Sequence, residues 1–437
     1  MPTTTPPPPT PAPGRRPPLP LGARPAHPPP FALPGSHFLA SLLWLAAGAA
    51  GLIVVAPELA RGGFLDPRVF AVVHAFTLGV ITTGIFGALY QMFPPLLGAT
   101  LRSVRVAGVG FALLTAGTLI LVAGLWRAAP YLQACGWTLV SGAIGCVSWN
   151  LLPQRRKAVQ GRITGLYISG GHSALGFALL LAGARIGEGL GWWQIDRLGM
   201  LSAHFHLAAL GFATLTAVGV GSRIVPMFLG TDGAPEWPLR WIGPLGGIGL
   251  LTLSVGQVAH LRPATLIGAA LLAAAMVLYL ALVVGYYRRR SRPVDPALLH
   301  LAAAYAGLAA TVVAGIALLW TTGAALQRGV AAYVALAVLG WLVMLMVGVY
   351  YRVIPFLTWL NLAGSAAARR DPGGLMHRRL AWVSFSALVG GVASLVGGVW
   401  TGAPPVARAG SIGFGAGVAL LLGQYARLMA LVRKSRS

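Results

Sequence analysis

Long apolar runs separated by short polar connections dominate the sequence after its first three dozen residues. Each run has about 20 residues, and a backbone in lipid must satisfy its own hydrogen bonds, so each run predicts a membrane-spanning helix. We therefore expect an all-α integral membrane protein with twelve transmembrane helices. The predicted spans are residues 37–58, 69–92, 104–125, 130–152, 165–184, 198–222, 241–260, 263–287, 298–322, 330–351, 380–400 and 406–426.

The composition agrees with a membrane protein. Hydrophobic residues make up 57% of the chain and charged residues 9%, and the mean hydropathy is +0.76. A soluble globular protein has about 25% charged residues. The composition therefore excludes a soluble enzyme and a secreted disulfide scaffold. Residues 1–36 contain 15 prolines, which predicts an extended, disordered tail and is not the pattern of a signal peptide.

The charges are unevenly placed. The chain has 32 Lys and Arg residues against 8 Asp and Glu residues. Of the basic residues, 24 lie in or beside the two tails and the even-numbered connections, and 8 lie in or beside the odd-numbered ones. This bias predicts that both termini, including a basic tail at 427–437, are cytoplasmic in a bacterial-type inner membrane. The lipid bilayer then explains the basic charge without a nucleic-acid partner. The carboxylates all lie in loops or at span ends, which disfavours a coupled transporter.

The second and sixth predicted spans are two copies of one pattern. When they are placed on each other without a gap, His74 aligns with His206 and Gly79 aligns with Gly211. The tenth span is a third copy, in which Ala335 takes the position of the histidine. Parallel repeats of this kind indicate a pseudo-threefold bundle. The expected four-helix repeats are 37–152, 165–287 and 298–426.

Glycines are concentrated in the three repeated spans, so we expect these spans to form the innermost ring. A glycine in a membrane helix lets another backbone or a flat cofactor approach closely. Gly79 and Gly211 are therefore candidates for flanking a cofactor, with simple helix packing as the alternative.

Three histidines are predicted to share one depth in the membrane. His74 lies six residues after Arg68, and His204 and His206 lie seven and nine residues after Arg197, or about 9–13 Å along a helix. Neutral imidazole ligates haem iron and copper. We predict a b-type haem held by His74 and one of His204 or His206. The other member of that pair points about 200° away, where it could bind copper. The alternative is that all three are packing residues.

Three further histidines recur near the starts of the first, fifth and ninth spans. They are His37, His172 and His300. We interpret their recurrence as shared ancestry and an interfacial position rather than as a ligand set.

Several local patterns resemble a known superfamily. Gly87-Ala88-Leu89-Tyr90 leads to Pro94, Gly348-Val349-Tyr350-Tyr351 leads to Pro355, and His204-Phe205-His206 forms a His-x-His pair. With twelve spans, these resemble subunit I of the haem-copper oxidases, above all the C-type oxidases and nitric oxide reductases. They also resemble the haem- and copper-containing NnrS proteins. The resemblance implies respiratory oxidoreductase chemistry, handling of electrons, nitric oxide or oxygen, and an electron-donor cytochrome or quinol.

The sequence also departs from that superfamily. Its oxidases have a His-His copper dipeptide on span seven, where this chain has only His260. Their tenth span donates haem ligands, where this chain has Tyr333 and Ala335. A complete dinuclear centre cannot be assembled, and no catalytic residue is assigned. Our first hypothesis is a haem-binding relative. The alternatives are a terminal oxidase or nitric oxide reductase subunit with altered ligands, and a cofactor-free transporter or structural protein.

Overall fold

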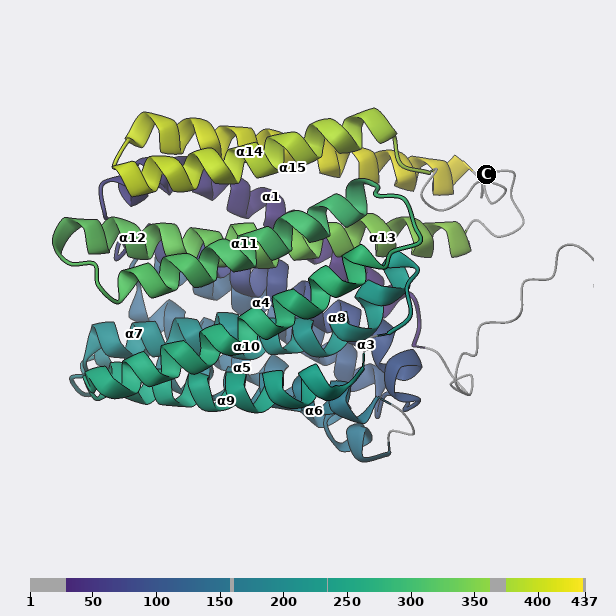
Figure 1. Ribbon diagram of the computed structural model, residues 1–437. Helices are drawn as coiled ribbons and strands as arrows, with labels where there is room; N and C mark the ends of the chain where they lie inside the picture. The colour runs from purple at the N-terminus through teal and green to yellow at the C-terminus, as the bar shows by residue number, and fades with distance from the viewer. Residues whose placement is uncertain (1–28, 158–160, 234, 362–374, 435–437) are drawn as a thin grey trace, which may run out of the picture.

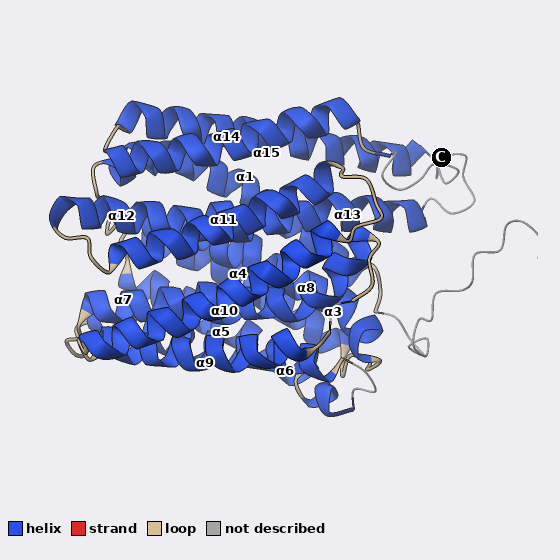
Figure 2. Ribbon diagram, viewed as in Figure 1, coloured by secondary structure: helices blue, strands red, loops and turns tan. Residues whose placement is uncertain are grey.

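The computed structural model describes residues 29–157, 161–233, 235–361 and 375–434. Within these ranges the regular structure is entirely helical, and no strand occurs (Figure 2). The long helices lie side by side along one common direction, and short connections join them at the two ends of the bundle (Figure 1). This arrangement satisfies the backbone hydrogen bonds within each helix, as a lipid environment requires.

Twelve helical segments of the described chain are long and apolar enough to cross a membrane, which confirms the predicted number of spans. The chain is therefore a multi-pass membrane protein. Nine spans are single helices: α1 (Ala32–Ala60), α4 (Val104–Trp126), α5 (Pro130–Leu151), α6 (Arg162–Gly189), α9 (Trp237–Val258), α10 (Arg262–Arg288), α11 (Pro296–Leu318), α14 (Arg378–Thr401) and α15 (Pro404–Lys434). A short 3₁₀ helix, η2 (Pro153–Lys157), follows α5.

The other three spans each contain a π-helix between two α-helices. They are α2–η1–α3 (Pro67–His74, Ala75–Thr82, Thr83–Leu97), α7–η3–α8 (Arg197–His206, Leu207–Thr214, Leu215–Leu229) and α12–η4–α13 (Gly323–Ala335, Leu336–Val343, Met344–Asn361).

These three interrupted spans are the most buried in the molecule. The buried share of their most hydrophobic stretch is 78, 67 and 78%, against 44% at most in the other nine. The segments η1, η3 and η4 contact one another pairwise. Their central position agrees with the expectation that the glycine-rich spans form the inner ring. The single helices surround them, and α4–α5, α9–α10 and α14–α15 pack as hairpins.

The tail boundaries differ from the predicted ones. Residues 1–28 of the predicted disordered tail lie outside the described residues, but α1 already begins at Ala32 and includes Pro34. A proline is tolerated there because a residue in the first turn has no helical partner for its N–H. The predicted basic tail is also largely helical, since α15 continues to Lys434.

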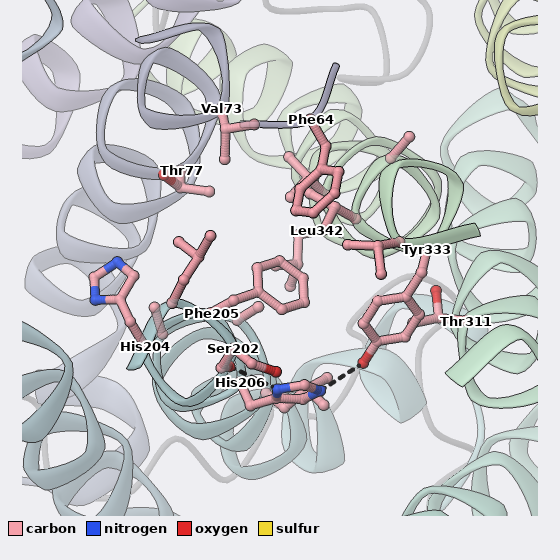
Figure 3. A pocket seen from close by; sticks show the side chains of 18 of the residues that line it. Phe64, Val73, Thr77, Ser202, His204, Phe205, His206, Thr311, Tyr333 and Leu342 are labelled. Carbon is pink, nitrogen blue, oxygen red and sulfur yellow. Dashed lines mark hydrogen bonds between the residues drawn. The ribbon is translucent and has the colours of Figure 1, made fainter. Parts of the chain in front are cut away.

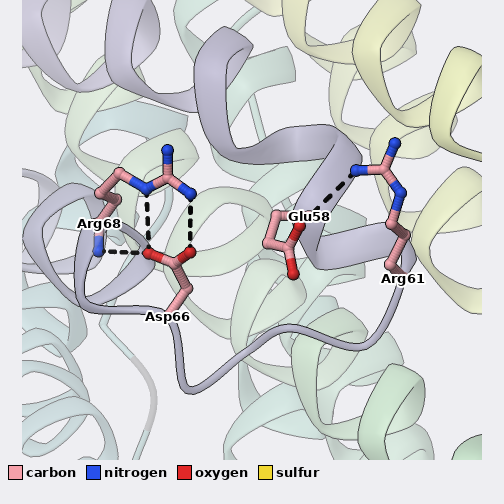
Figure 4. A network of polar contacts seen from close by, with 4 residues as sticks. All are labelled: Glu58, Arg61, Asp66 and Arg68. Atoms are coloured by element: carbon pink, nitrogen blue, oxygen red, sulfur yellow. Dashed lines mark hydrogen bonds and ion pairs between the residues drawn. The ribbon is translucent and has the colours of Figure 1, made fainter.

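Asp66 begins the first interrupted span as the N-cap of α2. Its Oδ1 accepts a hydrogen bond from the Arg68 backbone N–H at 2.7 Å, and its carboxylate forms an ion pair with the Arg68 guanidinium at 2.9 Å (Figure 4). The hydrogen bond from the Arg68 side chain lowers the pKa of the Asp66 carboxyl group below its ordinary value. At the end of the preceding helix, the guanidinium of the C-cap residue Arg61 lies 3.6 Å from the Glu58 carboxylate. Each end of the α1–α2 connection therefore carries an ion pair between residues that are close in the sequence.

Candidate functional site

The three central spans change to π-helical geometry next to the predicted ligand positions. The segments η1, η3 and η4 begin directly after His74, His206 and Ala335. In η1 and η3 a threonine hydroxyl donates to the carbonyl five residues earlier, from Thr82 and from Thr214, each at 2.8 Å. π-helical turns are rare and are frequent at functional sites. They identify the level of the three histidines as a candidate site.

A cavity of about 710 Å³ lies at this level. It is enclosed mainly by apolar side chains, and Phe64, Val73 and Phe205 point toward its centre (Figure 3). All three predicted ligands, His74, His204 and His206, are among its lining residues. The described residues that line it include no Asp, Glu, Lys or Arg. The cavity therefore combines apolar walls with neutral imidazoles.

The rings of His74 on α2 and His204 on α7 lie beside each other. Their ring centres are 6.2 Å apart and their planes differ by 25°. His74 Nδ1 donates to the Phe70 carbonyl at 2.8 Å, and His204 Nδ1 donates to the Ala178 carbonyl at 2.9 Å. A carbonyl oxygen only accepts, so each proton is on Nδ1 and the Nε2 lone pair is left for a ligand bond. Metal-binding histidines are commonly oriented in this way.

His206 points to a different part of the cavity, toward α12. Its Nδ1 donates to the Ser202 carbonyl at 2.7 Å, and its Nε2 accepts from the Tyr333 hydroxyl at 3.1 Å (Figure 3). The opposite directions of His204 and His206 are those expected for two residues that lie two positions apart on one helix. The structure thus brings His74 together with His204 and pairs His206 with Tyr333.

Tyr333 is the site residue that the sequence analysis did not assign. Tyr333 aligns with His204 in the repeated pattern, and this alignment could have indicated a site residue. We interpreted the tyrosine only as the absence of a haem ligand. The alignment gave no indication that the phenol hydrogen-bonds to a histidine of the neighbouring span. That pairing depends on how the spans pack together.

Gly79 and Gly211 do not line the cavity. A Cβ atom on Gly79 would overlap with the Trp44 side chain, and one on Gly211 would lie 2.6 Å from the Ala174 Cβ. Both glycines therefore allow close contact with the surrounding helices α1 and α6. These contacts are the ones that the helix-packing alternative expects, and the place of the two glycines beside a cofactor stays a prediction.

His37, His172 and His300 lie outside the cavity lining. Each Nδ1 donates to the carbonyl four residues earlier, at 2.7, 2.9 and 2.6 Å. Each ring also packs against aromatic side chains. Their positions are not equivalent, because Gly87 approaches His37 while the aligned Gly219 approaches Tyr167.

The described residues contain no group of three or more His, Cys, Asp or Glu side chains placed to share a metal ion. The polar groups available to a cofactor are therefore the imidazoles, the Tyr333 phenol and a few hydroxyl and amide groups of the cavity wall. Comparison of the sequence with models of known protein families and with curated protein sequences gave no match.

Proposed function

We propose that the chain is a haem-binding membrane protein, related to the haem-copper oxidases, that handles electrons or a diatomic gas such as nitric oxide or oxygen. One observation supports this most strongly. Two intramembrane histidines from different spans, His74 and His204, lie together at an apolar cavity with both Nε2 atoms free of a proton. Ionisable side chains within a membrane are costly and mark functional sites.

His74 and His204, which both line the cavity and whose ring centres lie 6.2 Å apart, would hold the haem. The volume of about 710 Å³ lies within the usual range of roughly 300–1,000 Å³ for cofactor pockets. Bound haem would supply one-electron chemistry or a site for a gas.

The protein would contribute ligand orientation and exclusion of water. The carbonyls of Phe70 and Ala178 hold the two imidazoles in the tautomer that a metal needs. The apolar wall lowers the local polarity, which is one of the means by which a protein adjusts a haem potential. Copper is a second candidate cofactor, near His206, but Tyr333 already occupies the Nε2 atom of that residue.

We also propose that the three four-helix repeats are related by a pseudo-threefold axis and that both ends of the chain are cytoplasmic. The starts of η1, η3 and η4 are separated by the same intervals as the aligned positions of His74, His206 and Ala335. The three hairpin turns each contain a left-handed residue, Ala128, His260 or Gly402, with φ of 50°, 56° and 71°. The even number of spans puts both ends of the chain on one side, and the positive-inside bias assigns that side to the cytoplasm.

Absorbance spectroscopy of the purified protein tests the haem proposal. A reduced-minus-oxidised spectrum and metal analysis should show haem iron, and His74→Ala or His204→Ala should abolish or shift the spectrum. His300→Ala is the matched control, because it also removes a buried histidine but lies outside the cavity lining.

Full retention of an unchanged spectrum in His74→Ala would refute the ligand pair. Absence of any haem and metal in the protein purified from cells able to supply both would favour the cofactor-free alternative. Rapid oxygen or nitric oxide consumption by the haem-loaded protein would instead favour a reductase with altered ligands.

A further inference from the structure

The end of α10 and the connection to α11 carry a concentrated positive charge. Four arginines occur within five residues there, and all four side chains are exposed: Arg288, Arg289, Arg290 and Arg292. A guanidinium group donates two parallel hydrogen bonds to a phosphate or carboxylate group, which an ammonium group does not. These four residues, which we call the α10 arginine patch, are therefore suited to binding an oxyanion.

No carboxylate neutralises the patch within the described part of the chain, because none of the ion pairs there includes one of its arginines. The acidic residues nearest in the sequence have other roles. Asp295 pairs with Arg352 at 2.9 Å and caps α11. Glu236, at the start of α9, pairs with Arg223 at 3.1 Å. The patch thus keeps a net positive charge that an external anion can neutralise.

The backbone of the patch is held by the connection that follows α8. The backbone N–H groups of Ser291 and Arg292 both donate to the Leu229 carbonyl at 3.2 Å, and the Ser291 hydroxyl donates to the Gly230 carbonyl. A binding site that is already ordered loses less conformational entropy when its ligand binds. The arginines are therefore presented from a fixed base.

The four guanidinium groups differ in what they already contact. Arg289 Nε donates to the Gly285 carbonyl at 3.2 Å, and an Arg290 nitrogen donates to the Tyr287 carbonyl at 2.9 Å. These two side chains bind free carbonyls at the end of α10, where positive charge is favourable. The guanidinium groups of Arg288 and Arg292 have no partner among the described residues. These two are the groups that can bind an external molecule without breaking an internal contact.

Exposed apolar side chains lie next to the patch along the bundle. The helix α10 is long and apolar enough to cross a membrane, and Val284, one turn before Arg288, is exposed. The hairpin α9–α10 brings the start of α9 beside the end of α10 (Figure 1). Trp237 and Trp241 are exposed in the first turns of α9. Because tryptophan is enriched where lipid headgroups meet the apolar core, we place the patch at the level of the headgroups.

We propose that the α10 arginine patch binds the phosphate group of an anionic phospholipid. Arg288 and Arg292 donate to the phosphate oxygens, while Arg289 and Arg290 add positive charge. The acyl chains lie along the exposed apolar surface of α9 and α10, a contact that a soluble anion or an acidic peptide does not make. Basic clusters directly beyond a membrane helix attract anionic lipids in this way. The proposal depends neither on a bound haem nor on the side of the membrane that the patch faces.

Native mass spectrometry of the purified full-length chain in neutral detergent tests the proposal. Dioleoyl phosphatidylglycerol is the anionic probe, and dioleoyl phosphatidylcholine, with the same acyl chains and no net charge, is the neutral probe. The first phosphatidylglycerol should bind to the unmodified chain about tenfold more tightly than the first phosphatidylcholine. In the double variant Arg288→Gln/Arg292→Gln the two lipids should bind equally. Should that variant fail to fold, Arg292→Gln alone should still reduce the preference.

The matched control is Arg378→Gln/Arg379→Gln, which removes the same charge from two exposed arginines at the start of α14. It should keep the full preference for phosphatidylglycerol. An equal loss in this control would mean that only the total charge matters and would overturn the site, as would an unchanged preference in Arg288→Gln/Arg292→Gln. His74→Ala should also keep the preference, so failure of the haem proposal would be distinguishable.

Two competition experiments test the class of ligand. Inorganic phosphate at the concentration of the lipid should not displace phosphatidylglycerol, because it lacks the acyl chains. Displacement would assign the patch to a free anion. Octaglutamate should bind more weakly than phosphatidylglycerol for the same reason. Tighter binding of octaglutamate that Arg288→Gln/Arg292→Gln abolishes would assign the patch to an acidic protein and overturn the lipid proposal.

Discussion

Two contacts between neighbouring central spans use the same two helix positions and differ in chemistry. Between α2 and α7, the ring of His74 lies beside that of His204, and both Nε2 atoms are free of a proton. Between α7 and α12, His206 faces Tyr333, and the phenol donates to the imidazole. In the aligned repeats His74 corresponds to His206, and His204 corresponds to Tyr333. One residue difference therefore separates a potential ligand pair from a hydrogen-bonded pair.

The comparison shows how positions that align in the sequence can hold different side chains on neighbouring spans. The third pair of aligned residues is Val72 and Ala335, which both line the cavity and have no polar side-chain atom. The polar chemistry thus decreases from two imidazoles, to imidazole and phenol, to two aliphatic groups. The following predictions test whether residues 204 and 333 determine this difference.

We expect the largest effect on haem binding when the His74–His204 pair is changed into a histidine–tyrosine pair like that of His206 and Tyr333. His204→Tyr should place a phenol opposite His74 and remove one of the two proposed axial ligands. A phenol donor would occupy the His74 Nε2 atom, as Tyr333 occupies that of His206. We expect loss of nearly all bound haem, measured by the reduced-minus-oxidised spectrum and by iron content per chain. Tyr333→Phe, which alters only the second contact, is the control and should retain haem.

The reverse exchange should create a ligand pair where none exists. Tyr333→His would place a second imidazole opposite His206 and remove the hydroxyl that occupies its Nε2 atom. Imidazole pairs bind zinc and copper as well as haem iron. We expect the variant to bind additional Zn²⁺ or Cu²⁺, measured by equilibrium dialysis and metal analysis. The double variant with His206→Ala should lose the gain, and retention of the extra metal there would show that it binds elsewhere.

A smaller effect is expected at the glycines behind the first contact. Gly79→Ala would bring a Cβ atom into overlap with the Trp44 side chain. Overpacking of this kind costs about 1–3 kcal/mol. The thermal midpoint in detergent should therefore fall, while the haem spectrum of the remaining folded protein stays unchanged. Gly247→Ala is the control, because a Cβ atom there would meet no atom outside its own helix within 4 Å. A changed spectrum without loss of stability would support Gly79 as a cofactor-flanking residue.

The sequence was sufficient to predict the membrane spans. It was not sufficient to predict which residues of the candidate site lie next to each other. Spans follow from apolar length and from backbone hydrogen bonding, which are local properties. The opposite directions of His204 and His206 follow from helical rotation. Which of them lies beside His74 depends on how α2, α7 and α12 pack around the cavity, and no local pattern encodes that. The pairing of His206 with Tyr333 and the position of Gly79 against Trp44 depend on the same packing.

The smallest expected effect concerns the residues that begin the two histidine-bearing helices. Asp66 caps α2 and is held by Arg68, whereas Asp196 caps α7 and lies 3.1 Å from His260 Nε2. Asparagine also caps helices well, so Asp66→Asn removes the charge and leaves a hydrogen-bonding side chain. Loss of the charge near a helix N-terminus should cost about 0.3–1 kcal/mol at low salt.

The pH dependence of this effect has a defined sign. Arg68 lowers the pKa of Asp66 in the folded chain, so the ionised carboxylate contributes stability above the unfolded-state pKa of about 4. That contribution is lost as the pH falls through the lowered folded-state pKa. The thermal midpoints of the unmodified chain and of Asp66→Asn should therefore differ near neutral pH and converge in acid. The difference should also shrink in high salt, because the pair is partly exposed and screened. A difference that persists in acid would mean that Asp66 acts through its shape and hydrogen bond alone.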